Sequence, residues 1–341
     1  MKTTHIKHIL LAALTVLSCS CIQQNNPADN TPADNMKALW TTLDERYCFF
    51  DEKGLDWDSV YQVYDEKTKN MASDDERGLF DTLAEMVNCL RDGHVNLYSP
   101  FEVSNYSGFY DVYPRNFNST LLYSRYLHNY HTAGSLIYDI IDDQYGYMRC
   151  ESFSKNFNEL NLYYIMTYLF RDNSCKGLII DVRNNGGGSI ENALYLASLF
   201  FKTDTTAVYM QHKTGKAHNA FSNPEPLLID KKKHSPSFVD VPIAVLTNRL
   251  CYSATNLFVA AMKNCDNCVV VGDKTGGGGG IPLSYEIPNG WMIRFSSVKM
   301  TDLNNLSIED GIMPDVKIDM KSADVDDIIE EAKKQIDSFS K

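Results

Sequence analysis

The feature that most limits how this chain can fold is a series of short apolar segments, each followed by a tight turn. The segments are Gly177–Asp181, Val241–Thr247 and Val269–Gly272. Helical periodicity follows the first two, over Ser189–Phe201 and Ala254–Met262. Continuous apolar strands that alternate with helices indicate a parallel sheet covered on both faces. We therefore expect an α/β core, assigned to residues 95–341.

In the region before this core, the apolar residues recur with a different period. Apolar residues recur at helical spacing from Met36 to Arg91, and Ser73–Glu76 has the pattern of a capping box. This predicts an N-terminal helical bundle over 36–94. A bundle of this size cannot bury all its apolar faces alone, so we expect it to pack on the core. Near the other end, Pro288-Asn289-Gly290 predicts a hairpin turn, and 323–339 predicts a closing helix.

The first residues have the pattern of an export signal. Two lysines precede an apolar run, Ile9–Leu17, that is too short to span a bilayer. The run ends in Leu17-Ser18-Cys19, which resembles a bacterial lipobox, so Cys19 is the first candidate for acylation and Cys21 the second. We assign 1–21 to the signal and the polar stretch 22–35 to a flexible tether. These features predict a lipid-anchored protein of the cell envelope of a Gram-negative-type bacterium, on the outer membrane or facing the periplasm.

Charge and cysteine content narrow the function classes. The formal net charge of -12 argues against nucleic acid as a partner, and the run Lys231–Lys233 is interpreted as a solvated loop. Of the nine cysteines, seven follow the signal and are scattered, as buried free thiols would be. Cys265 and Cys268 form a close pair without a matching second pair or histidine, which favours a turn. We expect no metal and no cofactor.

Three turns after the apolar strands are candidates for chemistry. Asn184–Gly188 can aim backbone N–H groups at an anion, as in an oxyanion hole, or can be only a tight turn. Thr275–Gly280 lacks the order of a phosphate-binding loop and suggests a floor for an extended chain. Ser253 stands between a strand and a helix, where it can be a nucleophile or a helix N-cap. Position alone favours the cap.

Four ordered motifs carry a family resemblance. They are Gly177–Gly188, Asn248–Ala254, Val270–Gly277 and Gly311–Asp315. Together they resemble the C-terminal-processing and tricorn-core serine peptidases, over most of 36–320. The resemblance implies a crotonase/ClpP-like core behind an N-terminal helical bundle. It also implies Ser253 as nucleophile, with an oxyanion hole formed by the N–H of Ala254 and that of Gly186 or Gly187.

Two departures from the tail-specific members place the chain in the tricorn-like branch. Gly278 stands where those members have their basic lysine, and Tyr98–Ser135 is too short for a PDZ module. In the tricorn branch the base is a histidine, which the resemblance assigns to His94, with Glu309 as its supporting carboxylate. The tricorn serine before that histidine is Gly93 here.

Lys274, four residues before the expected lysine, is the alternative base. The predicted function is a serine endopeptidase that hydrolyses peptides or proteins through an acyl-enzyme on Ser253. The alternative is a non-catalytic lipoprotein that binds peptide or an apolar ligand in the same cleft.

Overall fold

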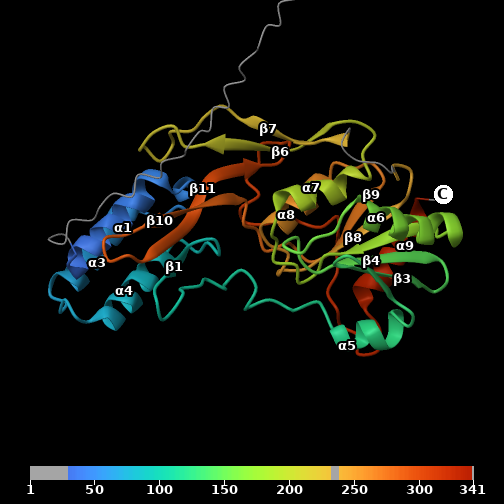
Figure 1. Cartoon of the computed structure of the whole chain (residues 1–341), viewed down its shortest axis with the longest axis horizontal. Helices are drawn as coiled ribbons and strands as arrows, with labels where there is room; N and C mark the ends of the chain where they lie inside the picture. The colour runs from blue at the N-terminus through green and yellow to red at the C-terminus, as the bar shows by residue number, and fades with distance from the viewer. Residues whose placement is uncertain (1–29, 232–237, 340–341) are drawn as a thin grey trace, which may run out of the picture.

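The structure is a computed structural model that describes residues 30–231 and 238–339 (Figure 1). The predicted signal, Cys19, Cys21 and most of the predicted tether lie outside these residues. The helices are α1 (Pro32–Arg46), α2 (Phe50–Lys53), α3 (Trp57–Lys69), α4 (Glu76–Asn88), α5 (Ser119–Leu121), α6 (Glu159–Met166), α7 (Ile190–Ser198), α8 (Ala254–Met262) and α9 (Asp327–Ser338), with π-helical turns η2 (Leu122–Tyr126) and η3 (Thr167–Asp172). The strands are β1 (Asn96–Tyr98), β2 (His131–Ala133), β3 (Leu136–Ile141), β4 (Tyr145–Cys150), β5 (Gly177–Asp181), β6 (Thr205–His212), β7 (Glu225–Ile229), β8 (Ile243–Thr247), β9 (Cys268–Gly272), β10 (Gly280–Glu286), β11 (Met292–Thr301) and β12 (Val316–Lys317).

The larger sheet has the strand order β12-β9-β8-β5-β4-β3-β2. Strands β4, β5, β8, β9 and β12 are parallel, whereas β2 and β3 form an antiparallel extension at one edge. The predicted α/β core is therefore confirmed, and β5 has the predicted bounds. The antiparallel edge is an addition to the parallel sheet expected from the sequence.

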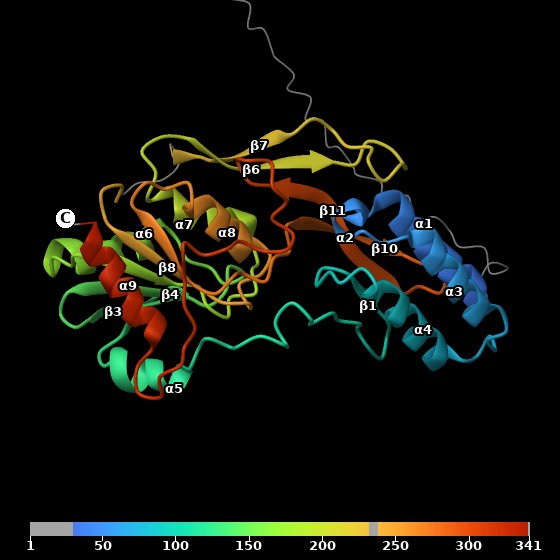
Figure 2. The same ribbon diagram turned by 180° about the vertical axis from the view of Figure 1, so that it is seen from behind.

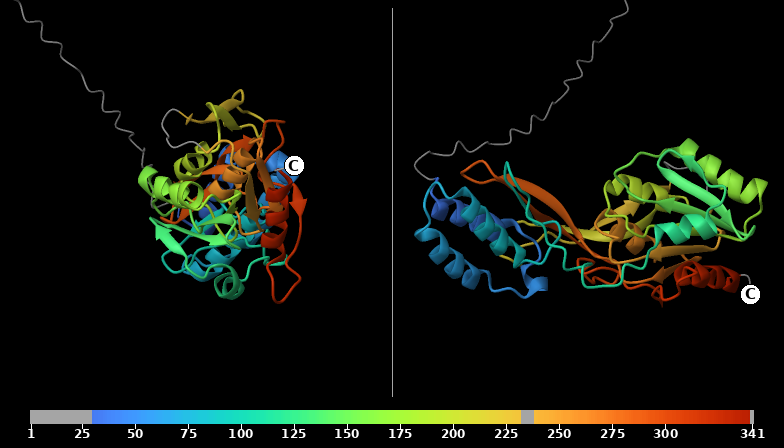
Figure 3. Two further views of the ribbon diagram at one scale, coloured as in Figure 1. Left: turned by 90° about the vertical axis from the view of Figure 1, so that its right-hand side faces the viewer. Right: turned by 90° about the horizontal axis from the view of Figure 1, so that it is seen from below.

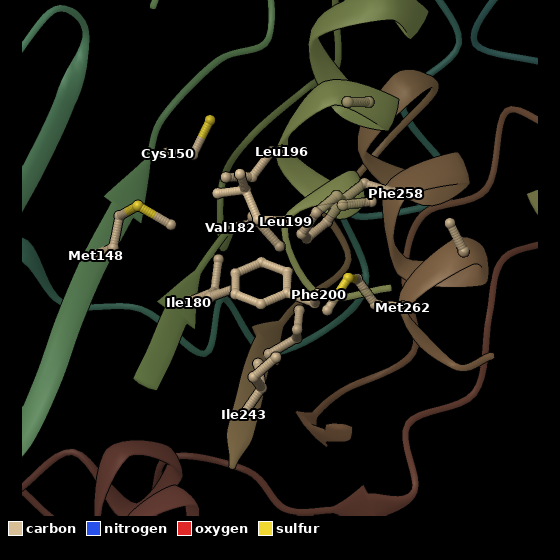
Figure 4. Packing of buried hydrophobic residues seen from close by; sticks show 14 of the residues in the cluster. Met148, Cys150, Ile180, Val182, Leu196, Leu199, Phe200, Ile243, Phe258 and Met262 are labelled. Atoms are coloured by element: carbon tan, nitrogen blue, oxygen red, sulfur yellow. The ribbon is translucent and has the colours of Figure 1, made fainter. Parts of the chain in front are cut away.

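Successive residues of the central strands face opposite layers. Leu178 and Ile180 of β5 pack in the cluster that includes α6, α7 and α8, while Ile179 packs in the cluster that includes α9. Figure 4 shows the first layer, where Ile180 and Ile243 lie near Phe200 and Phe258. Because both faces are apolar, every residue of β5 and β8 is buried.

A second sheet, β1-β11-β6-β7 with β10 paired to β11, joins the bundle to the core. Helices α1, α3 and α4 share one hydrophobic cluster with Trp291, Ile293 and Phe295 from the hairpin region. The bundle thus buries its apolar side chains partly against residues that the sequence assigned to the core. The hairpin was predicted, but β6 and β7 were not, because their residues lack a continuous apolar run.

Two boundaries predicted for the bundle are wrong. Helix α1 begins at Pro32, inside the predicted tether, because Thr31 and Asp34 form a capping box there. The cap of α4 is Asp75, whose side chain accepts the N–H of Gly78, and not Ser73. The first of these corrections moves the start of the fold four residues toward the N-terminus.

The chain between β1 and α5 crosses from the bundle to the core, as the teal segment of Figure 2 shows. Residues 99–118 contribute no helix or strand of their own among the elements described. The view from below in Figure 3 shows the bundle and the core at opposite ends of an elongated molecule. Within the described ranges, no helix is long and apolar enough to cross a bilayer.

Candidate active site

Three loops meet at one edge of the larger sheet. They follow β5, β8 and β9, which are adjacent parallel strands, so their carboxyl ends lie side by side. The loops are Asn184–Gly188, Asn248–Ser253 and Asp273–Gly279. This edge is where open α/β sheets usually hold their ligands.

Backbone hydrogen bonds fix these loops to one another. The N–H of Tyr252 donates to the carbonyl of Asn185 at 3.1 Å, and the N–H of Ser253 donates to the carbonyl of Gly277 at 2.9 Å. The side chain of Asn248 accepts the N–H of Asn184 at 3.0 Å. The loop of Ser253 is therefore held from both sides.

The glycines after Thr275 are buried beneath the loop of Ser253, not exposed as the floor for an extended chain that the sequence suggested. A Cβ on Gly277 would come within 1.9 Å of the carbonyl oxygen of Glu309. These glycines allow close backbone packing.

Ser253 occupies the N-cap position of α8 but its hydroxyl does not cap the helix. Its backbone has φ 58° and ψ -122°, a left-handed conformation that costs a non-glycine residue energy. The side chain instead points to His94, whose Nε2 lies 2.9 Å from the Ser253 Oγ. The cap interpretation fails because this hydroxyl is used elsewhere.

His94 lies two residues before β1, where the helical bundle joins the second sheet, and its side chain reaches Ser253 from there. Its side chain is only 3% exposed. Burial lowers the pKa of His94 to about 4; the carboxylate of Asp92 partly offsets this, and Arg294 adds to it. The ring is therefore neutral at pH 7 and can accept a proton. No hydrogen-bond partner for its Nδ1 occurs among the residues described.

Asp92 was not predicted from the sequence to have a role in the site. Its buried carboxylate accepts the N–H of His94 at 2.7 Å and the hydroxyl of Tyr252 at 3.2 Å. It also accepts the hydroxyls of Tyr47 at 3.1 Å and Ser296 at 2.9 Å. Asp92 thus connects the backbone of His94 to the bundle, to β11 and to the residue before Ser253.

Glu309 lies close to this network without touching His94. Its carboxylate accepts from the Lys53 ammonium at 2.9 Å and from the N–H of Gly279 at 2.9 Å, and the described residues include no hydrogen bond between Glu309 and His94. Burial raises the pKa of Glu309 to about 8; Asp92 adds to this, and Lys53 opposes it. Its support of His94 stays a prediction.

Lys274, the alternative base, lines a neighbouring cavity of about 350 Å³ that Glu309 and Gly93 also line. Neither Ser253 nor His94 lines that cavity. Ser253 and His94 share a separate cavity of about 410 Å³. The structure therefore brings His94, and not Lys274, to the hydroxyl.

Phe109 closes the space beside Gly93. Its ring stacks on Tyr252 with centroids 4.4 Å apart. A Cβ on Gly93 would lie 2.8 Å from the ring of Phe109. The aromatic ring therefore occupies the space into which a side chain at position 93 would extend.

The candidate oxyanion donors lie beside Ser253. The Cα of Gly187 is so close that a Cβ there would lie 2.8 Å from the Cβ of Ser253 and 2.9 Å from the nitrogen of Ala254. The N–H of Gly187 already donates to the side chain of Asn185 at 2.9 Å. Within residues 30–231 and 238–339, the N–H groups of Gly186 and Ala254 have no recorded partner. Of the two predicted glycines, Gly186 is the available donor.

Three further residues line the cavity of Ser253 and were not found from the sequence. They are Ser152, Ser154 and Arg294. Ser154 lies against Gly188, and Arg294 lies on β11 opposite Asn96 of β1. Arg294 lines this cavity because β1 pairs with β11 in this register, and no local sequence pattern predicts that register.

The part of the chain that the structure describes contains no group of three or more His, Cys, Asp or Glu placed to hold a metal ion. Cys48, Cys89, Cys150, Cys175, Cys251, Cys265 and Cys268 are free thiols.

Comparison with known proteins gives the family. Residues 144–318 match peptidase family S41, and residues 28–88 match the tricorn protease C1 domain. A crystal structure of a candidate peptidase from Parabacteroides merdae is 40% identical, with a TM-score of 0.84, over 90% of this chain and 96% of that one. Mature CPAF, at 12% identity, has a similar fold with a TM-score of 0.65 over 92% of this chain and 97% of that one.

Curated relatives include candidate CtpA-like serine proteases from Staphylococcus aureus, 30% identical over 145 residues, and from Staphylococcus saprophyticus, 29% identical over 143 residues. Each match covers 42% of this chain and 27% of the relative's length. The fold and the loops at the sheet edge define a member of the serine peptidases. The chain belongs to peptidase family S41, as the four motifs predicted.

Proposed function

We propose that the protein is a serine endopeptidase that cleaves peptides or proteins through an acyl-enzyme on Ser253, with His94 as general base. The observation that carries the proposal is the 2.9 Å contact between the Ser253 Oγ and the His94 Nε2. The left-handed backbone of Ser253 supports it, because such strain is often found at active sites.

In the proposed reaction, neutral His94 accepts the Ser253 proton as the Oγ attacks the carbonyl carbon of the substrate. The N–H groups of Ala254 and Gly186 stabilise the oxyanion that forms, helped by the N-terminal end of α8. His94 then protonates the leaving amine, and water hydrolyses the acyl-enzyme by the reverse proton transfers. Glu309 is proposed as the carboxyl group that supports His94.

We also propose that the mature protein is attached to the cell envelope by acylation of Cys19. The short apolar run before this cysteine supports the proposal. Mass spectrometry of the membrane fraction should find a lipidated N-terminal peptide that begins at Cys19. An unmodified Cys19 in the mature chain would contradict it.

The proposed activity is tested with Ser253→Ala. Hydrolysis of a quenched fluorescent peptide library should fall to background, a loss of at least about 10⁴-fold, because no nucleophile is left. Labelling by a fluorophosphonate probe should also disappear. The control is Ser338→Ala, which removes a hydroxyl bonded only to the carbonyl of Gln335 in α9.

Unchanged hydrolysis by Ser253→Ala would overturn the assignment. Peptide binding by the wild-type protein, with neither hydrolysis nor probe labelling, would favour the alternative of a non-catalytic binding lipoprotein.

A further inference from the structure

The cavity of Ser253 contains a cation that the proposed reaction does not use. Arg294 lies on β11 and lines the same cavity as Ser253, His94 and Gly186. Its side chain is half-buried. No Asp or Glu of residues 30–231 or 238–339 lies within 4.0 Å of its guanidinium nitrogens. A cation in this position is suited to a charge that comes from outside the chain.

The strand register places Arg294 beside the catalytic pair. Arg294 is the direct partner of Asn96 in the antiparallel β1–β11 pair, and Asn96 follows His94 by two residues. The guanidinium donates one hydrogen bond, from Nη1 to the Oδ1 of Asn96 at 3.3 Å. Arginine has five N–H donors in a planar fork. Most of the fork is therefore left for another acceptor.

Other shielded arginines of the protein are paired, which sets Arg294 apart. Arg183 is fully buried and bonds to Asp181 at 2.6 Å and to Asp326 at 2.8 Å. Arg249, in the neighbouring cavity, bonds to Asp273 at 2.9 Å. These arginines hold the fold together through carboxylates of the chain. Arg294 has only a neutral amide, so a purely structural role accounts for it less well.

The charge of Arg294 is not balanced by the other residues of the cavity. The other described residues that line the cavity are glycines, Ser152, Ser154, Tyr252, Ser253 and His94. His94 is neutral at pH 7, since burial lowers its pKa to about 4. Among the described residues that line the cavity, Arg294 is thus the only one with a charged side chain. Because screening limits such a charge to about 8 Å at physiological salt, it acts on groups bound in the cavity itself.

We propose that Arg294 binds a carboxylate of the peptide substrate, so that the enzyme prefers peptides with a carboxylate close to the bond that is cleaved. A carboxylate matches the guanidinium fork in shape and charge and can accept two parallel N–H bonds. The carboxylate is either an Asp or Glu side chain or the free C-terminus of the substrate. This inference rests on the proposed peptidase function.

The test uses pairs of peptides that differ by one charge. One series exchanges Glu for Gln at each position on either side of a cleaved bond. A second series compares a free C-terminus with its amide. In the wild-type protein, kcat/KM should be about 10- to 100-fold higher for the peptide that carries the carboxylate than for its neutral partner, as expected for a charge-assisted hydrogen bond. The series that shows the preference identifies the source of the carboxylate.

Arg294→Gln should reduce that ratio to about one, because the amide cannot discriminate by charge. Arg294→Lys should keep part of the preference, since the charge remains without the fork. The control is Arg171→Gln, which removes an exposed arginine paired to Asp172 and should keep the full ratio. Ratios within one variant are insensitive to how much protein is folded, and circular dichroism checks the fold of each variant.

A wild-type ratio near one in both series would overturn the inference, and so would a ratio that survives Arg294→Gln. Failure of the peptidase function is recognised separately, by measuring peptide affinity for the Ser253→Ala protein by fluorescence anisotropy. Tighter binding of the carboxylate peptides that depends on Arg294, without hydrolysis by the wild type, supports the carboxylate site and rejects the peptidase. Hydrolysis by the wild type without any charge preference rejects the carboxylate site alone.

Discussion

Ser253 and His94 come from two regions of the molecule that are built differently. Ser253 belongs to the α/β core, where its loop is bonded to the loops that follow the adjacent strands. His94 belongs to the junction of the bundle with the second sheet, and Asp92 holds its backbone. The proposed nucleophile is thus positioned by neighbours within one sheet. The proposed base is positioned by hydrogen bonds that join the bundle, β11 and the core, so its placement depends on how those regions pack.

The sharpest test of this division compares the two candidate bases. His94→Ala should lower kcat/KM by at least about 10⁴-fold, because no other base among the described residues bonds to the Ser253 hydroxyl. Lys274→Ala should change it by less than about threefold, since Lys274 lines the other cavity. Steady-state kinetics on one peptide measures both. The opposite order of losses would restore a serine–lysine dyad.

The pH dependence of kcat/KM separates the same two bases by titration. With His94 as base, kcat/KM should rise with pH through about 4, the pKa of His94, and stay level from about pH 5.5 to about pH 8. A rise that continues into the alkaline range would indicate a lysine. The unfolded His94 has a higher pKa, near 6.5, so the unfolded chain binds more protons between these values. His94 therefore makes folding less stable as pH falls from 6.5 toward 4, which thermal unfolding can follow.

Asp92→Asn tests whether the junction positions the base. The carboxylate accepts four hydrogen bonds, and an amide cannot accept all of them. We expect a loss of about 2–4 kcal/mol in the free energy of unfolding and about 10- to 100-fold in kcat.

A purely structural loss would leave the acid limb of the pH profile unchanged. Loss of the Asp92 charge should instead move it to lower pH, because Asp92 raises the pKa of His94. The matched control is Ser296→Ala, which removes one donor to Asp92 and keeps the charge. An unmoved acid limb in Asp92→Asn would contradict electrostatic support of His94 by Asp92.

The smallest predicted effect is that of Ser253→Gly, which tests the backbone strain of one residue in the α/β core. Glycine adopts the left-handed backbone of this position without strain, and the hydroxyl makes no cap bond that would be lost. The variant should be inactive but more stable than Ser253→Ala by about 1–2 kcal/mol in chemical unfolding. Equal stability of the two variants would show that the backbone of Ser253 is not strained.

The sequence predicts the core far better than the junction, for a physical reason. Strand β5 and helix α8 have the predicted bounds because their apolar periods depend on local burial. The loops after β5 and β8 were also found, because glycine and serine there follow apolar strands directly. His94 and Glu309 could be named only through the family resemblance.

The residues missed from the sequence owe their roles to pairing at long range. Arg294 is one polar residue in an alternating strand, and Asp92 is one acid in a turn. Their significance depends on the antiparallel register of β1 with β11, which no local period encodes. Asp92 also needs the hydroxyls of Tyr47 and Tyr252, which lie 45 and 160 residues away in the chain.

The contact of Phe109 with the space beside Gly93 has a consequence for how this site can change by mutation. A serine at position 93, as in the tricorn branch, would meet the rings of both Phe109 and Tyr252, the nearer atom belonging to Phe109. Gly93→Ser alone is therefore expected to be unfavourable, and so is loss of the ring alone, which would leave Tyr252 unstacked. Introducing the serine of the tricorn branch at position 93 therefore also requires a smaller side chain at position 109. Positions 93 and 109 should be changed together.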